Sequence, residues 1–210
     1  MHYMNRHLNT RLKDVLNMVQ RRIVTNTKYF GIKCSKSPMD FWVYREMIFE
    51  MKPDVIIELG CGRGGATLAL AHTCDLINHG RVYAIDNSTE KVDIRTLSHP
   101  RVTVLEGDAC ALFAHIRDKV GPDESVFVIE DTDHTYENTL NILNTYSPLI
   151  KKGGYFIVED TNGSCGIGRA RGAFEATETF TKQNTCFECD RSKEVFFITW
   201  NPKGYLRRIE

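Results

Sequence analysis

Short apolar runs alternate with segments of helical periodicity between residues 54 and 160. This alternation is typical of parallel β-strands joined by crossover helices. The pattern predicts helices at residues 65–74 and 137–150, and strands at residues 55–59, 81–86, 101–108, 125–131 and 154–160. It therefore predicts an α/β fold built on a mainly parallel sheet.

The N-terminal end has a different pattern, because Lys and Arg predominate in residues 1–28, where Asp14 is the one acidic residue. Apolar residues recur there at spacings of three and four, at Leu8, Leu12, Val15, Leu16, Val19 and Ile23. This spacing predicts an amphipathic, basic helical arm. We expect the arm to pack on its own domain or on a neighbouring subunit. A membrane-surface helix and a transit peptide are the alternatives.

The C-terminal end is predicted to add a hairpin to the sheet. Residues 174–182 have a helical pattern, and the runs at 184–190 and 194–200 predict two strands joined by a turn around Arg191 and Ser192. An antiparallel hairpin of this kind would close the sheet. We expect a single domain overall, with the arm and the segment leading into the fold in residues 1–50 and the α/β part in residues 51–210.

Composition narrows the class of function. The chain has 210 residues, and its 27 Lys and Arg balance its 27 Asp and Glu, which argues against a nucleic-acid or acidic-membrane binder that works through bulk charge. No apolar run reaches the roughly 18 residues of a membrane helix, so we expect no integral membrane association. Seven cysteines without zinc-site spacing predict reduced thiols in a cytoplasmic protein, and the single CxxC, at Cys186 and Cys189, predicts ordinary half-buried cysteines.

The first chemical signal is a glycine-rich loop, Glu58-Leu-Gly60-Cys-Gly62-Arg-Gly64-Gly65, that follows a predicted strand and opens a helix. Glycines there allow a ligand to approach the backbone and the helix N-terminus. The next two predicted strands end in acidic residues, at Asp86 and Asp108. The loop alone also permits a nicotinamide-dinucleotide site.

The combination of this loop with the two later acids resembles class I S-adenosylmethionine-dependent methyltransferases. That resemblance implies that Gly60 and Gly62 line the amino-acid part of S-adenosylmethionine, with Glu58 in the same binding loop. It also implies that Asp86 accepts hydrogen bonds from both ribose hydroxyls and that Asp108 lies by the adenine.

The second chemical signal is a pair of acidic clusters at two strand ends. The first is the run Glu130-Asp131-Thr-Asp133-His134, and the second is the pair Glu159-Asp160. Parallel strands open their carboxyl ends onto one edge, so these carboxylates converge, and they repel one another unless they are protonated or bind a cation. We predict a site for an oxygen-preferring divalent ion, with a solvated acidic rim as the alternative.

Several motifs together resemble the cephalosporin hydroxylase and rhamnosyl O-methyltransferase family over about residues 25–210. They are D-T-D-H-T, V-E-D-T-N, N-P-K-G-Y-L-R-R and the segment at residues 31–44. The resemblance implies a Rossmann-like class I methyltransferase fold and metal ligands at Asp133, Glu159 and Asp160, with Mg²⁺ the first choice and Mn²⁺ the second. The arginine-bearing loop at residues 163–172 departs from the family, which bears on acceptor specificity.

The function implied by the resemblance is a divalent-metal-dependent O-methyltransferase that acts on a hydroxyl of a sugar or natural-product small molecule. The cation, held in part by Asp133, would align the acceptor oxygen and lower its pKa. His134 is the nearest candidate base, and a cofactor contact is its alternative role. The competing hypotheses are a hydroxylase-associated component of a two-protein system and a nicotinamide-binding or nonenzymatic protein. The expected partners are a small-molecule acceptor and, through the arm, a second copy of the chain.

Overall fold

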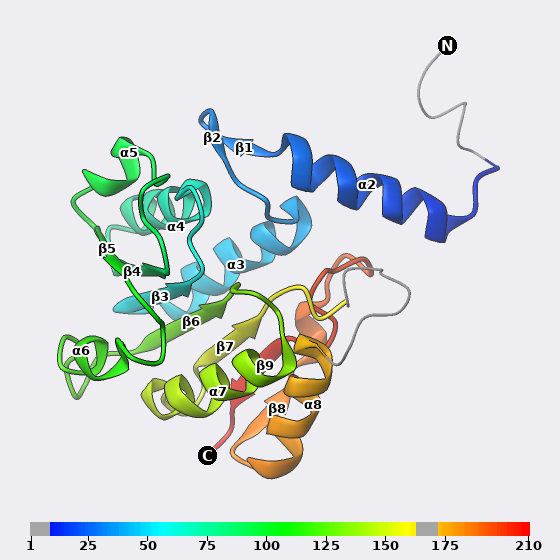
Figure 1. The fold of residues 1–210 in the computed structure, drawn as a ribbon. Coiled ribbons are helices and arrows are strands. Elements are labelled where there is room, and N and C mark those ends of the chain that lie inside the picture. Colours follow the sequence, from blue (N-terminus) through cyan, green and yellow to red (C-terminus); the bar gives the residue numbers. More distant parts are fainter. Residues whose placement is uncertain (1–8, 163–171) are drawn as a thin grey trace.

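The computed structural model describes residues 9–162 and 172–210, and a seven-stranded sheet forms its centre (Figure 1). The strand order is β5-β4-β3-β6-β7-β9-β8. The first five strands in this order run parallel to one another, and β9 is antiparallel to both β7 and β8. The strands are β3 (Val55–Leu59), β4 (Arg81–Asp86), β5 (Val102–Glu106), β6 (Val126–Glu130), β7 (Tyr155–Val158), β8 (Phe187–Cys189) and β9 (Tyr205–Arg208). The predicted α/β fold with a mainly parallel sheet is confirmed.

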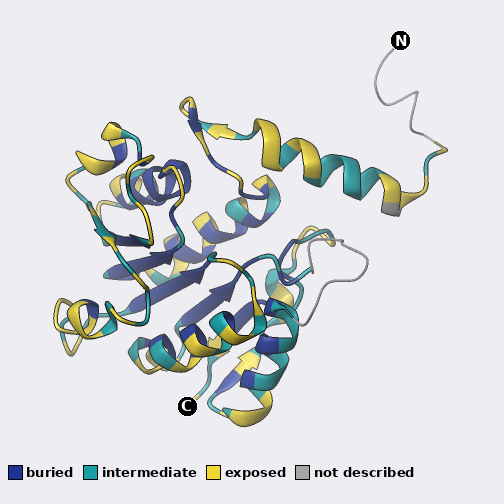
Figure 2. Ribbon diagram, in the orientation of Figure 1, coloured by how far each residue is buried: buried dark blue, intermediate teal, exposed yellow. Residues whose placement is uncertain are grey.

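Helices cover both faces of the sheet, which explains why β3, β6 and β7 are buried along their whole length and are apolar except at Glu58 and Glu130 (Figures 1 and 2). One face packs against α3 (Pro38–Met51) and α4 (Gly65–Leu76). The opposite face packs against α6 (Phe113–Arg117), α7 (Tyr136–Tyr146) and α8 (Ala173–Gln183). Short α5 (Ile94–Leu97) lies beside α4 and β5.

The helix predicted at residues 137–150 ends earlier than expected. α7 stops at Tyr146, and a 3₁₀ turn, η1 (Ser147–Leu149), follows it. Pro148 explains the break, because a proline ring disfavours continuation of an α-helix through its own position.

The predicted C-terminal hairpin is present, but its second strand lies elsewhere. β8 pairs with β9 at Tyr205–Arg208, whereas residues 194–200 form no strand, so that prediction was wrong. The 3₁₀ turn η3 (Arg191–Lys193) redirects the chain, and Phe197 has a left-handed φ of 64° and is 90% exposed. Tyr205 and Leu206, in contrast, are buried in the two cores, so β9 is the strand that the fold can bury.

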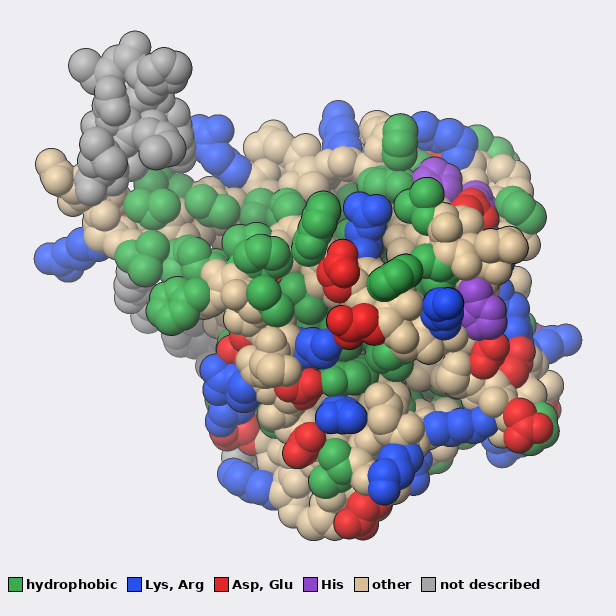
Figure 3. Space-filling model, turned by 180° about the vertical axis from the view of Figure 1, so that it is seen from behind, with side chains coloured by type: hydrophobic (Ala, Val, Ile, Leu, Met, Phe, Trp, Pro, Cys, Tyr) green, Lys and Arg blue, Asp and Glu red, His purple; other side chains and the backbone are tan. Residues whose placement is uncertain are grey.

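The predicted helical arm is α2 (Leu12–Asn26), which projects from the body of the molecule and leads into a small hairpin of β1 (Lys28–Tyr29) and β2 (Ile32–Lys33). Seen from behind, hydrophobic side chains gather along the arm (Figure 3). Within the described residues, none of the helices has the length and apolar character needed to cross a bilayer. Cys186 and Cys189 are half-buried free thiols packed against the core, as expected.

Candidate active site

A cavity of about 650 Å³ opens at the carboxyl ends of β3, β4, β5 and β6. Open α/β sheets bind ligands at this edge. All five residues predicted to contact a cofactor line this cavity, at Glu58, Gly60, Gly62, Asp86 and Asp108. The structure therefore brings together residues that are up to 50 positions apart in the sequence.

Gly60 and Gly62, in the loop after β3, have different structural surroundings. Gly60 has φ +90°, and a Cβ there would lie 2.0 Å from the backbone oxygen of Asp131, so glycine is needed for the ends of β3 and β6 to approach. Gly62 has φ +55°, and a Cβ there would meet nothing within 4 Å. Its backbone consequently borders open space in the cavity, as a ligand-facing loop requires.

The carboxylate of Asp86 is fixed by the backbone around it. Its Oδ2 accepts the Gly62 N–H at 2.8 Å, and its Oδ1 accepts the Ser88 N–H at 3.2 Å. Each carboxylate oxygen has a further lone pair, so both can still accept a hydroxyl proton from a vicinal diol. Asp108, which also lines the cavity, accepts the Ala111 N–H at 2.8 Å.

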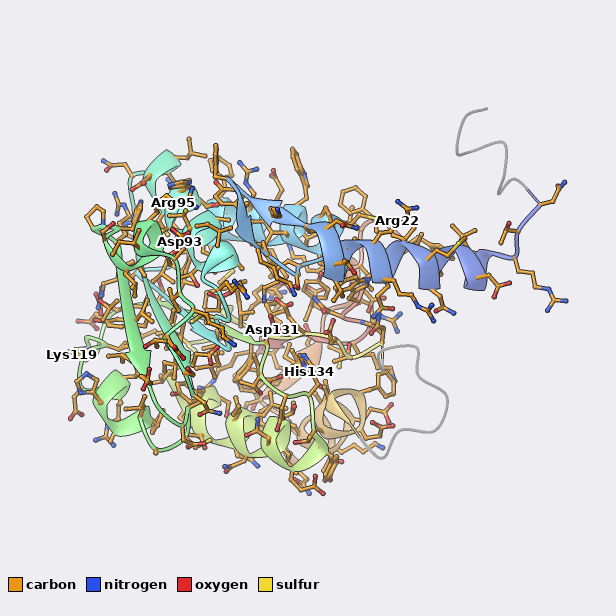
Figure 4. All side chains as sticks on the ribbon, turned by 45° about the horizontal axis from the view of Figure 1, so that its top comes forward. Arg22, Asp93, Arg95, Lys119, Asp131 and His134 are labelled. Atoms are coloured by element: carbon orange, nitrogen blue, oxygen red, sulfur yellow. The ribbon has the colours of Figure 1, made fainter. Side chains whose placement is uncertain are left out.

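Beside this cavity, Asp131, His134 and Asp160 form a cluster whose candidate ligand atoms all lie within 4.8 Å of one another. His134 Nε2 is 3.5 Å from Asp131 Oδ1 and 3.4 Å from Asp160 Oδ2. Figure 4 shows Asp131 and His134 close together near the ends of the central strands. Asp131 directly follows β6, and Asp160 follows β7 by two positions, so adjacent parallel strands deliver the two carboxylates.

The cluster has features of a site that is built for a ligand. His134 and Asp160 both have left-handed backbones, with φ of 57° and 53°, a conformation that is uncommon outside glycine. His134 Nδ1 and Asp160 Oδ1 are buried without a hydrogen-bond partner. Burial, and then the negative charge of Asp131, raises the pKa of Asp160 to about 6. A divalent cation would relieve the repulsion between the carboxylates and would give Asp160 Oδ1 a partner.

Two of the predicted metal ligands lie outside this cluster. Asp133 turns toward the start of α7, where its Oδ1 accepts from Thr135 N–H, Thr135 Oγ1 and Asn138 Nδ2, each at 3.0 Å. These hydrogen bonds outweigh partial burial and lower the pKa of Asp133. Glu159 is 4% exposed and accepts from Lys36 and Tyr44. The cluster contains Asp131 and not Asp133, which lines the cavity, and the role of Asp133 as a metal ligand stays a prediction.

Lys36 is a site residue that the sequence reasoning missed. Its Nζ lies 2.5 Å from Asp131 Oδ2, 2.7 Å from Glu159 Oε1 and 3.8 Å from Glu58 Oε1. Burial alone would lower the pKa of Lys36, but these three carboxylates outweigh burial and raise it well above its usual range. The signal that could have revealed it is its place in the segment at residues 31–44, which already carried the family resemblance.

A hydrogen-bond network ties the C-terminal segment to the same cluster. Asn201 Oδ1 accepts the Asp160 N–H at 3.0 Å, and Asn201 Nδ2 donates to Tyr44 at 2.6 Å. Tyr44 in turn donates to Glu159 Oε1 at 3.1 Å. Asn201 therefore helps to hold the left-handed backbone of Asp160 in place.

A second group, His72, Asp75 and His99, also has metal-ligand types within 4.8 Å of one another. The backbone N–H of Arg101 donates to His99 Nδ1 at 3.3 Å, so Nε2 carries the proton that His99 donates to Asp75 at 3.1 Å. The Arg101 guanidinium also pairs with Asp75 at 2.6 Å. This group is an ion-pair network that already satisfies its own charges, so it is the weaker metal candidate.

The loop at residues 163–172, expected to affect acceptor specificity, lies outside the described residues except for Gly172. Ala173, the first residue of α8, donates its backbone N–H to the backbone oxygen of His134 at 3.1 Å. The start of α8 is thereby attached to the candidate metal cluster.

Comparisons with known proteins agree with this geometry. Residues 21–209 match the family described as Rhamnosyl O-methyltransferase/CmcI. The chain is 32% identical over 193 residues to a Rhamnosyl O-methyltransferase of Mycobacterium tuberculosis (strain ATCC 25618 / H37Rv), covering 88% of this chain and 79% of the relative. It is 31% identical over 191 residues to the Mycobacterium leprae (strain TN) protein of the same name, covering 87% and 83%. An apo structure of CmcI has the same fold, with a TM-score of 0.70 at 23% identity over 88% of this chain and 76% of that one.

Proposed function

The chain belongs to the Rhamnosyl O-methyltransferase/CmcI family, and we propose on this basis that it is a divalent-metal-dependent enzyme that methylates a hydroxyl of a sugar or natural-product small molecule. Family membership makes it an S-adenosylmethionine-dependent O-methyltransferase, and the resemblance seen in the sequence is confirmed. A CmcI structure contains Mg and SAM, and an O-methyltransferase structure from Bacillus cereus contains SAH.

One observation carries the proposal: the cofactor-type cavity and the carboxylate–histidine cluster share Asp131. Asp131 lines the cavity, and its Oδ1 lies 3.5 Å from His134 Nε2. Methyl transfer needs the sulfonium methyl and the acceptor oxygen side by side. A cofactor in the cavity and a cation at the cluster would be neighbours across this one residue.

The oxygen donors fit Mg²⁺ or Mn²⁺ better than a softer metal. Asp131 and Asp160 would hold the ion. Glu159 lies outside this cluster, bound to the same Lys36 ammonium as Asp131, and would join the ion by exchanging that ammonium for it. When bound, the cation would supply the charge that lowers the pKa of an acceptor hydroxyl. We propose this set in place of one that includes Asp133, whose hydrogen bonds serve the loop before α7.

His134 is placed to receive the acceptor proton. Its Nε2 lies within 3.5 Å of the two carboxylates that would hold the ion, so it would be close to an acceptor hydroxyl bound there. His134 is absent from the cavity lining, although its neighbours Thr132 and Asp133 belong to it. We therefore favour the base role for His134 over a cofactor contact.

The acceptor class rests on the relatives. Two mycobacterial relatives are named for methylation of a rhamnosyl group, and a sugar hydroxyl suits a site of oxygen ligands and one base. The acceptor would enter where the cavity meets the cluster, next to the start of α8.

Methyl transfer from S-adenosylmethionine carrying a labelled methyl group tests the proposal. We expect label in a rhamnoside or related glycoside when Mg²⁺ is present, with mass spectrometry placing it on oxygen. His134→Ala should slow transfer by at least about 100-fold, the usual worth of a general base. His79→Ala, which removes a histidine paired with Asp54 away from the cavity, is the matched control. Cofactor binding without transfer to any hydroxyl acceptor would contradict the proposal.

A further inference from the structure

Lys36 occupies an unusual electrostatic position. Its side chain is 6% exposed, and its ammonium meets carboxylates from three strand ends, at Glu58, Asp131 and Glu159. A buried ammonium of this kind is tolerated because the negative charges of the three carboxylates offset its loss of hydration. It places a positive charge between the cofactor cavity, which Lys36 lines, and the candidate metal cluster.

The ammonium is held rigidly on the α3 side of the cluster. Lys36 directly precedes Ser37, which caps α3 by accepting the Asp40 N–H at 3.4 Å. Glu159 Oε1 accepts from Lys36 at 2.7 Å and from Tyr44, on α3, at 3.1 Å. Lys36 and Glu159 are therefore fixed to each other and to α3.

The two carboxylate oxygens of Asp131 have different partners. Its Oδ2 contacts Lys36 at 2.5 Å, while its Oδ1 faces His134 at 3.5 Å. A carboxylate that already neutralises an ammonium attracts a second cation less strongly, and the ammonium itself repels that cation. The same ammonium engages Glu159, the acidic neighbour of Asp160.

We propose that Lys36 is an internal counter-ion that limits the affinity of this site for divalent cations. In the metal-free protein it holds Asp131 and Glu159 together against their mutual repulsion. When a divalent ion binds, it competes with this ammonium for the same two carboxylates. Lys36 thus acts on the ion through the carboxylates that it occupies, and it keeps the bound ion exchangeable. The inference rests on the proposed function, because it assumes that the ion binds beside Asp131 and Asp160.

A purely structural lysine would give the opposite result. Removing a structural cation would disorder the carboxylates and weaken metal binding. Removing a competing cation should tighten binding, because Asp131 and Glu159 both become available to the ion. The direction of the change in affinity therefore separates the two roles.

The experiment is a Mn²⁺ titration of the full-length protein, followed by the electron paramagnetic resonance signal of free Mn²⁺. Lys36→Met should tighten binding by about tenfold, from loss of one nearby repelling charge. Lys36→Arg, which keeps the charge, should stay within about threefold of the wild type. Glu159→Gln should cost more affinity in the Lys36→Met background than in the wild type, since Lys36 no longer competes for Glu159.

The possible outcomes are distinct. Unchanged or weaker Mn²⁺ binding by Lys36→Met, or equal effects of Glu159→Gln in both backgrounds, would overturn the role of Lys36 while leaving the metal site intact. If Lys36→Met does not fold, as judged by circular dichroism, Lys36→Gln decides instead, because it removes the charge but can still donate to a carboxylate, and unchanged or weaker Mn²⁺ binding by that variant would overturn the proposal. No Mn²⁺ binding by the wild type would refute the metal dependence in the proposed function.

Discussion

Asp160→Asn should stabilise the metal-free protein at pH 7 while removing its response to Mg²⁺. Asn tolerates the left-handed backbone of this position about as well as Asp, so the substitution mainly removes a charge. That charge is unfavourable in the fold, since burial and Asp131 raise the pKa of Asp160 from 3.8 to about 6. The charges of His134 and Lys36 act in the opposite direction and lower the pKa of Asp160, whereas the charge of Asp40 raises it further.

The magnitude follows from linkage. A pKa that is higher in the folded than in the unfolded state means that stability falls as pH rises through the window from 3.8 to about 6. Above that window the ionised Asp160 costs about 3 kcal/mol, at about 1.4 kcal/mol per pH unit. Asp160→Asn should recover a large part of this, on the order of 1 to 3 kcal/mol. Between pH 7 and pH 5 the wild type should gain about 1 kcal/mol that the variant does not gain.

The assay is urea unfolding in EDTA at pH 7 and pH 5, repeated at pH 7 with saturating Mg²⁺. At about 100 times its dissociation constant, a bound ion should stabilise the wild type by about 2.7 kcal/mol and leave Asp160→Asn unchanged. Asp133→Ala is the matched control. It should lose about 1 kcal/mol with its hydrogen bonds to Thr135 and Asn138 but keep the response to Mg²⁺. A less stable Asp160→Asn in EDTA, or one that Mg²⁺ still stabilises, would refute this reasoning.

Three further predictions concern the cofactor loop and the arm. Asp86→Ala should weaken S-adenosylmethionine binding by about 1 to 3 kcal/mol in calorimetry, whereas Asp93→Ala, outside the cavity lining, should not; equal affinities would remove Asp86 from the site. Gly60→Ala should destabilise the fold far more than Gly62→Ala in thermal unfolding, because only the former brings a Cβ to 2.0 Å from the backbone oxygen of Asp131; similar losses would contradict the packing argument. We also propose that the arm packs against a second copy, so deletion of residues 1–24 should lower the mass in light scattering without loss of cofactor binding; an unchanged mass would make the arm a local element.

The parallel core was predictable because its pattern is strong. The segments at β3 and β4 have the predicted bounds, since continuous apolar runs that end in turn residues leave little freedom of assignment. Residues 194–200 misled the prediction because an apolar run alone does not show whether a strand partner is available. The burial of Tyr205 and Leu206 is a tertiary fact that no local pattern contains.

Some residues of the candidate site could likewise be predicted from the sequence, and others could not. The glycine loop and Asp86 lie in one local pattern after two successive strands, so their convergence on one cavity could be predicted. Which of Asp131 and Asp133 lies in the cluster depends on side-chain direction, because the hydrogen bonds that draw Asp133 toward α7 are invisible in the sequence. Lys36 lies 95 positions before Asp131, and only the packing of α3 against the sheet brings them together.

The location of a bound ion tests the central claim most directly. A crystal of the full-length protein grown with Mn²⁺ and S-adenosylhomocysteine, measured at a wavelength where manganese scatters anomalously, would show that location. The account predicts one anomalous peak in contact with Asp131 and Asp160, beside His134 and at the edge of the cofactor cavity. A peak at His72, Asp75 and His99, or no peak beside Asp160 when the cofactor product is bound, would contradict it.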